Sequence, residues 1–193
     1  MTHKILTIGR QYGSGGLEVG YAVADRLGIE CYHRRLIQMA AESGDIDIHT
    51  LAAADEKRIK EQPYMDESES GAIEKINDRL FELQSDVIRD LAAQESCIIV
   101  GRCANYVLKD VPGVYSVFIR ADMEDRLDRV ISMSYMSEKQ ALKTIKKVDK
   151  ERNEYYRTYT HKSWGEQDGY DIILNFSSLG KEECTDILYD LMK

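Results

Sequence analysis

Five short apolar runs lie along the chain, and the segments between them have helical periodicity. The runs are four to six residues long and are bounded by glycine or polar residues, which is typical of β-strands. They cover residues 4–8, 30–33, 96–100, 114–119 and 171–174. The run at 96–100 is apolar almost throughout, which indicates a strand that is covered on both faces.

Amphipathic helices are predicted between these runs. In the clearest one, apolar residues are spaced three and four apart, so that they share one face: Ile73, Ile76, Leu80, Leu83, Val87 and Leu91. Another helix is expected to begin at Ser137, which can form a capping box with Gln140. The alternation of strands and helices predicts parallel strands joined by right-handed crossovers, and hence a three-layer α/β/α domain with a five-stranded parallel sheet.

Two segments depart from this alternation. Residues 43–71 are expected to form an inserted lobe, with a helical piece at 48–60 and an acidic end at 61–71. Residues 139–162 hold eight Lys and Arg against three acidic residues, in a chain whose formal net charge is −8. This basic segment fits a solvated helix face, and it fits equally a segment that closes over an anion.

Composition excludes several classes of protein. A chain of 193 residues with 43% hydrophobic and 31% charged residues is long enough for one domain with a real core. The pI of about 5.1 argues against nucleic acid as a partner, and no apolar run approaches the roughly 20 residues of a membrane span. The four cysteines and four histidines are scattered, without the spacing of a disulfide scaffold or a zinc site. With no signal peptide in evidence, we expect a reduced, cytoplasmic protein.

The most informative segment is glycine-rich and follows the first predicted strand. Residues 9–20 contain five glycines, whose exposed backbone N–H groups can converge on an anion at the start of the next helix. A purely structural turn needs only one or two of them. The dinucleotide fingerprint fails, because its third glycine would fall at Glu18. A phosphate-binding P-loop fits better in shape, although Gly16 and Leu17 stand where that motif has lysine and a hydroxyl residue.

Three strings in this order resemble the cytidylate kinase-like family, which is related to the nucleoside monophosphate kinases. They are Ile8–Gly16, Ile98–Arg102 and Val148–Arg157. The resemblance implies a P-loop kinase-like domain over residues 1–193. Its core would comprise residues 1–33, 95–136 and 165–193, with an acceptor-binding lobe at about 34–94 and an arginine-bearing lid at about 137–164.

The resemblance also implies roles for individual residues. The phosphates of Mg-ATP would lie on the loop, held by Arg10, Tyr12, Gly13, Ser14, Gly15, Gly16 and Leu17. The acceptor would contact Arg102, with Arg35 also in the substrate site. The transferred phosphoryl group would be clamped by Arg129, Arg152 and Arg157 as lid residues, ordered by Asp149. Together with Arg102 these are the candidate catalytic residues. Mobile arginines suit this chemistry, because phosphoryl transfer depends mainly on positioning and charge neutralisation.

The chain departs from the family's pattern at several charged positions. Gly16 replaces the lysine, Leu17 stands where many members have arginine, and His33 replaces the acid expected after the second strand. Cys103 stands where true cytidylate kinases have aspartate. Since no carboxylate follows the strand at 96–100, no magnesium ligand is assigned.

These observations lead to two main hypotheses. The first is an ATP-dependent kinase that acts on a nucleoside monophosphate such as CMP, or on a related small acceptor. The second is a catalytically weakened nucleotide-binding protein that acts through partners, because each departure removes a charge that the reaction would use. A nicotinamide-dependent oxidoreductase ranks third, since the glycine spacing is wrong for it.

Overall fold

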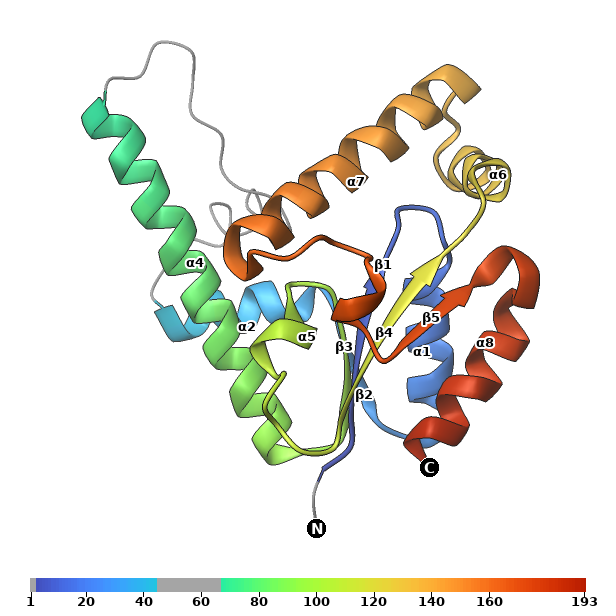
Figure 1. The fold of residues 1–193 in the computed structure, drawn as a ribbon, viewed down its shortest axis with the longest axis horizontal. Coiled ribbons are helices and arrows are strands. Elements are labelled where there is room, and N and C mark those ends of the chain that lie inside the picture. The colour runs from blue at the N-terminus through green and yellow to red at the C-terminus, as the bar shows by residue number, and fades with distance from the viewer. Residues whose placement is uncertain (1–2, 45–66) are drawn as a thin grey trace.

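The computed structural model describes residues 3–44 and 67–193. In this part of the chain, five parallel strands form one sheet in the order β2-β3-β1-β4-β5 (Figure 1). The strands are β1 (Ile5–Arg10), β2 (Glu30–Tyr32), β3 (Cys97–Val100), β4 (Val114–Arg120) and β5 (Ile172–Asn175). All five predicted strands are confirmed, with ends that agree within two residues.

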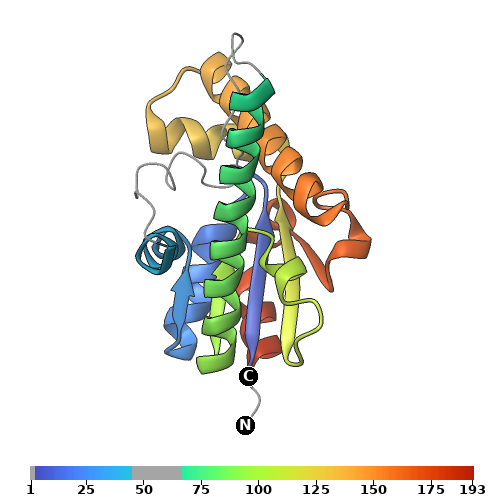
Figure 2. The same ribbon diagram turned by 90° about the vertical axis from the view of Figure 1, so that its left-hand side faces the viewer.

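Helices cover both faces of the sheet, as the apolar strand at 96–100 predicts. The four residues of β3 are fully buried. Ile98 and Val100 pack in the apolar cluster formed with α1 (Gly16–Leu27) and α8 (Phe176–Met192). Cys97 and Ile99 pack in the opposite cluster, formed with α2 (Arg35–Gly44) and α4 (Glu67–Gln94). Figure 2 shows α4 crossing one face of the sheet, which confirms the three-layer α/β/α architecture.

The remaining helices lie in two connections of the sheet. A short helix, α5 (Ala104–Val107), follows β3. Between β4 and β5 the chain forms α6 (Met123–Ser134), α7 (Glu138–Thr160) and the 3-10 turn η1 (Gln167–Gly169). The backbone N–H of Ser137 donates to Gln140 Oε1 over 3.0 Å, which confirms the predicted capping box at the start of α7.

The long helix α4 carries the predicted apolar face only along part of its length. Leu80, Leu83, Val87 and Leu91 are buried in the core. Ile76, in contrast, is 42% exposed, because the N-terminal end of α4 extends beyond the sheet (Figure 1). The helical piece predicted at 48–60 lies outside the described residues. Residues 61–66 of the predicted acidic end lie outside them as well.

Helix α7 crosses the carboxyl end of the sheet and is anchored by its C-terminal half (Figure 1). Tyr159 stacks on Phe81 of α4 with ring centroids 4.0 Å apart. The Tyr155 hydroxyl donates to Gln84 Oε1 over 3.2 Å. The lysines of the N-terminal half are exposed: Lys139, Lys143, Lys146 and Lys147. Most of the basic run is therefore a solvated helix face. None of the described helices has the length and apolar character needed to cross a membrane.

Candidate functional site

The glycine loop lies at the carboxyl end of β1 and leads directly into α1. Gly13 and Gly15 have φ values of 79° and 80°, in the left-handed region that favours glycine. The loop is fixed to the end of β4, because Gln11 N–H and Ser14 Oγ both donate to the Ile119 carbonyl, over 3.1 and 2.9 Å. The loop therefore holds the first N–H groups of α1 in place as a candidate anion cradle.

Two glycines of the loop also allow close approach of neighbouring side chains. A Cβ atom on Gly15 would lie 2.6 Å from the Phe176 ring at the start of α8. A Cβ atom on Gly16 would lie 2.6 Å from Arg10 Cβ. The sequence of the loop is thus required by packing as well as by backbone conformation.

Replacing Gly15 by alanine is expected to destabilise the protein and weaken ATP binding together. The left-handed conformation of a non-glycine residue costs about 1–2 kcal/mol, and the overlap with Phe176 adds about 1–3 kcal/mol. Gly28→Ala is the matched control, because Gly28 also has a positive φ of 67° but has nothing within 4 Å of an added Cβ. Urea unfolding and calorimetric titration with ATP measure both effects. Equal losses for the two variants would contradict the packing role of Gly15.

The loop opens into a large cleft of ≈ 1200 Å³. The cleft extends from the glycine loop along α1 to the end of β2. It is lined by all seven residues from Arg10 to Gly16, by Leu17 and Glu18, and by further basic side chains: His33, Arg34, Arg129, Arg152 and Lys181. The lining also includes the acidic residues Asp25, Glu30 and Glu151, so the cleft as a whole is mixed in charge, and the part of it that suits an anion is the glycine loop at the N-terminus of α1.

Glu18 holds two of these basic groups at one edge of the cleft. Its carboxylate accepts from Arg129 and lies 3.4 Å from the Lys181 ammonium. The hydrogen bond from Arg129 lowers the pKa of Glu18 below its ordinary value. The Arg129 guanidinium also lies 4.8 Å from the centre of the Phe176 ring. Arg129 is thus held at the cleft, on the side of the loop that faces α8.

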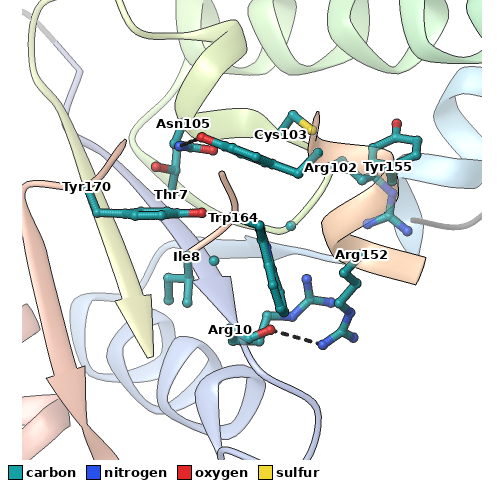
Figure 3. A pocket seen from close by; sticks show the side chains of 13 residues that line it. Thr7, Ile8, Arg10, Arg102, Cys103, Asn105, Arg152, Tyr155, Trp164 and Tyr170 are labelled. Atoms are coloured by element: carbon teal, nitrogen blue, oxygen red, sulfur yellow. Dashed lines mark hydrogen bonds between the residues drawn. The ribbon is translucent and has the colours of Figure 1, made fainter. Parts of the chain in front are cut away.

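A second, small cavity of ≈ 20 Å³ lies behind the loop (Figure 3). Three arginines line it, namely Arg10, Arg102 and Arg152, and none of the described residues that line it is acidic. Its other wall is aromatic and includes Trp164 and Tyr170 (Figure 3). Burial raises the pKa of Tyr170, so this hydroxyl stays neutral. The cavity therefore combines positive charge with neutral side chains, in a volume that holds about one water.

Arg102 reaches this cavity from an unusual turn after β3. Gly101, Arg102 and Cys103 all have positive φ, at 87°, 55° and 55°. Two adjacent non-glycine residues in this region carry backbone strain of a kind that is concentrated at functional sites. The turn buries the Arg102 side chain, which is only 2% exposed, and lets its Nη1 donate to the His33 carbonyl over 2.7 Å.

A buried ion pair ties the glycine loop to α6 and α7. The Asp149 carboxylate of α7 accepts from the Tyr12 backbone N–H over 2.8 Å and pairs with the Arg126 guanidinium of α6. Arg126 Nε in turn donates to the Tyr12 carbonyl over 2.8 Å. Sequence reasoning missed Arg126, because it lies among alternating acidic and basic residues that are typical of a solvated helix face. Asp149 does order an arginine, but that arginine is Arg126.

The structure brings most of the predicted site residues together and places two elsewhere. Arg10 and Arg152 line both cavities, and Arg102 lines the small one. Arg157 is exposed on α7 and lines neither cavity. The Arg35 side chain is 64% exposed and lies 3.7 Å from Glu30, whereas its neighbour Arg34 lines the large cleft. The roles assigned to Arg35 and Arg157 stay predictions.

The described residues contain no ready-made cage of metal ligands. Among them, no group of three His, Cys, Asp or Glu side chains is placed to hold a metal ion. Leu17, at the position of the usual hydroxyl ligand, packs against the apolar cluster under α1 and α8. We therefore assign no protein ligand to magnesium and derive no step through it.

Comparison with known proteins defines the class first. Solved structures with this fold include a shikimate kinase from Bacteroides thetaiotaomicron (14% identity, TM-score 0.57, 98% of each chain covered). They also include a sugar kinase from Janibacter sp. HTCC2649 (17% identity, TM-score 0.54, 98% of this chain and 94% of that one). The fold is accordingly that of the P-loop kinases.

The particular family follows from the sequence. The chain belongs to the cytidylate kinase-like family, whose model matches residues 5–178. An uncharacterized protein from Eubacterium ventriosum ATCC 27560 is similar to it over 98% of both chains, with 28% identity and a TM-score of 0.76. A search among curated proteins gave no match.

Proposed function

We propose that this protein is an ATP-dependent phosphotransferase that acts on a small anionic acceptor. One observation carries the proposal: three arginines from β1, the turn after β3 and α7 line one cavity directly behind a glycine loop at a helix N-terminus. Such an arrangement can neutralise the charge on a phosphoryl group and on its acceptor at the same time.

The donor side of the proposal is the glycine loop. The triphosphate of ATP would lie on Gly13 to Gly16, where backbone N–H groups and the N-terminus of α1 favour negative charge. Arg129 is held at the same cleft by Glu18 and would meet the nucleotide there. Magnesium would arrive with the phosphates, since the described residues offer no ligand set for it.

On the acceptor side, an anionic group of the acceptor would meet Arg102 at the small cavity, which must widen to admit it, because ≈ 20 Å³ holds about one water. A nucleoside monophosphate such as CMP is the acceptor that the family name suggests. Cys103 stands where the resemblance implies an aspartate, and this favours a smaller acceptor in which a phosphate or carboxylate is the main recognition group. The fold relatives named as shikimate kinase and sugar kinase make acceptors of that size reasonable candidates.

The two segments beside the cleft complete the proposal. Residues about 34–94 would form the acceptor lobe, and residues about 137–164 would form the lid. Arg152 is a residue of α7 within this lid, and its Nη1 donates to the Arg10 carbonyl over 3.0 Å, so the middle of the lid already contacts the end of β1. We also propose a cytoplasmic location, where ATP is available.

The alternative is a nucleotide-binding protein with weakened catalysis. It is favoured by the uncharged residues at 16 and 17 and by the Asp149 carboxylate that occupies the Tyr12 N–H. Under this alternative, ATP binds and turnover does not depend on any acceptor.

The test is ADP formation from Mg-ATP with one acceptor at a time. The panel comprises CMP, dCMP, UMP, AMP, GMP, shikimate and gluconate, with an ATP-only background. An acceptor-dependent rate well above background supports the kinase and ranks its acceptors. ATP binding by calorimetry with no acceptor-dependent rate supports the weakened protein, and absence of ATP binding contradicts both.

A further inference from the structure

We infer that Arg10 supplies the donor phosphates with the positive charge that lysine at position 16 supplies in an ordinary P-loop. The inference rests on the proposed function, because it assumes that a polyphosphate binds at the glycine loop. It assigns a specific ligand-contacting role to a residue at the end of β1, before the glycines begin.

The first argument is steric. A Cβ atom on Gly16 would lie 2.6 Å from Arg10 Cβ and 3.1 Å from Arg10 Cγ. The stem of the Arg10 side chain thus fills the space in which any side chain at position 16 would start. Glycine at position 16 and arginine at position 10 are therefore sterically linked. The cation nearest the glycine loop comes from the end of β1, whereas in an ordinary P-loop it comes from the start of the helix.

The second argument is the position of Arg10 between the two cavities. Arg10 lines both the large cleft and the small arginine cavity. A group at this junction lies between the proposed donor and acceptor sites. A charge there can act on the phosphoryl group during transfer, when negative charge is spread between donor and acceptor.

The third argument is that Arg10 is held in place. The residue is only 5% exposed, and its Nη2 lies 3.1 Å from His33 Nε2. Its carbonyl accepts from Arg152 Nη1 over 3.0 Å (Figure 3). Little side-chain entropy remains to be lost when a phosphate binds, and a guanidinium can bind phosphate oxygens in bidentate fashion.

Other cations at the loop are less suited to this role. Arg129 and Lys181 both lie against the Glu18 carboxylate, whose lowered pKa shows that it stays ionised beside them. They also lie on the α8 side of the loop, away from the small cavity that Arg10 and Arg102 share.

The experiment exchanges the two positions. Arg10→Ala is expected to weaken the binding of ATP and of inorganic tripolyphosphate by about 10- to 100-fold, the loss of one or more charge-assisted hydrogen bonds. Gly16→Lys alone is expected to bind poorly, because the new side chain overlaps Arg10. The double variant R10G/G16K removes both Arg10 Cβ and Arg10 Cγ, the atoms that an added Cβ at position 16 would meet, and is expected to recover affinity to within about fivefold of the unaltered protein.

Calorimetric titration without acceptor measures all three variants, with Arg10→Lys as the conservative replacement. Arg26→Ala, which removes an exposed arginine paired with Asp186, is the matched control. Near-UV circular dichroism verifies that each variant is folded. If the unaltered protein binds neither ATP nor tripolyphosphate, the proposed function fails. If it binds them and folded Arg10→Ala binds equally tightly, the proposed function stands and the role of Arg10 is overturned. A folded double variant no better than either single one overturns the exchange of positions.

Discussion

Arg102→Met is expected to lower kcat/KM for the acceptor by about 100-fold, which corresponds to one or two charge-assisted hydrogen bonds. Methionine keeps much of the stem volume in a position that is 2% exposed, so packing changes little. The guanidinium, and with it the positive charge of the acceptor cavity, is removed. Since Arg102 lines the small cavity and not the large cleft, the affinity for ATP is expected to stay within about twofold.

The comparison that isolates this effect uses three variants. Arg102→Lys retains one charge without the bidentate geometry, and its kcat/KM is expected to lie between those of the unaltered protein and Arg102→Met. Arg26→Met removes an exposed arginine of α1 that pairs with Asp186, and it is expected to leave kcat/KM unchanged. Steady-state kinetics with the best acceptor of the panel provides the measurement. An unchanged kcat/KM for Arg102→Met would remove Arg102 from the acceptor site.

Arg126→Met is expected to lower the free energy of unfolding by about 3 kcal/mol. Breaking a buried ion pair by removing one partner costs about 3–5 kcal/mol, and the lower end applies because the Asp149 side chain keeps 21% exposure. The variant also leaves the Tyr12 carbonyl without its Nε donor. The glycine loop loses its attachment to α6, so weaker ATP binding is expected as well.

Urea unfolding of a double-mutant cycle tests the coupling. Arg126→Met and Asp149→Leu together are expected to cost less than the sum of the two single changes, because the double variant leaves no unpaired charge. Arg120→Met removes an exposed arginine 3.7 Å from Asp122, and it is expected to change stability by less than about 0.5 kcal/mol. Additive costs in the cycle would show that the buried pair is not coupled.

The fold could be predicted from the sequence because its signals are local. Each strand is a short apolar run, and the capping box at Ser137 lies within four residues of chain. The limit of such signals is visible in α4, where the apolar spacing continues to Ile76 although the sheet no longer covers that turn. Periodicity identifies a face of a helix, but it does not tell where the neighbouring layer ends.

The site was predictable only where a motif carries it. Arg10, Arg102 and Arg152 stand in strings that resemble a family, and all three meet in one cavity. The tie of Arg126 to Tyr12 spans more than a hundred residues and depends on how α6 and α7 pack. Arg34 lies in the turn before α2 and lines the large cleft, whereas Arg35 is the first residue of α2 and lies beside Glu30, a difference that no local motif of the sequence indicates.

The left-handed turn at Gly101, Arg102 and Cys103 restricts how this pocket can diverge during evolution. A side chain at position 103 must accept a φ of 55°, which β-branched residues do not and which aspartate, asparagine and glycine do readily. The aspartate implied by the family resemblance and the cysteine found here can therefore share one backbone. Under the proposed function, a substitution at position 103 would change the groups that the acceptor meets, while the turn would still direct the Arg102 side chain into the pocket.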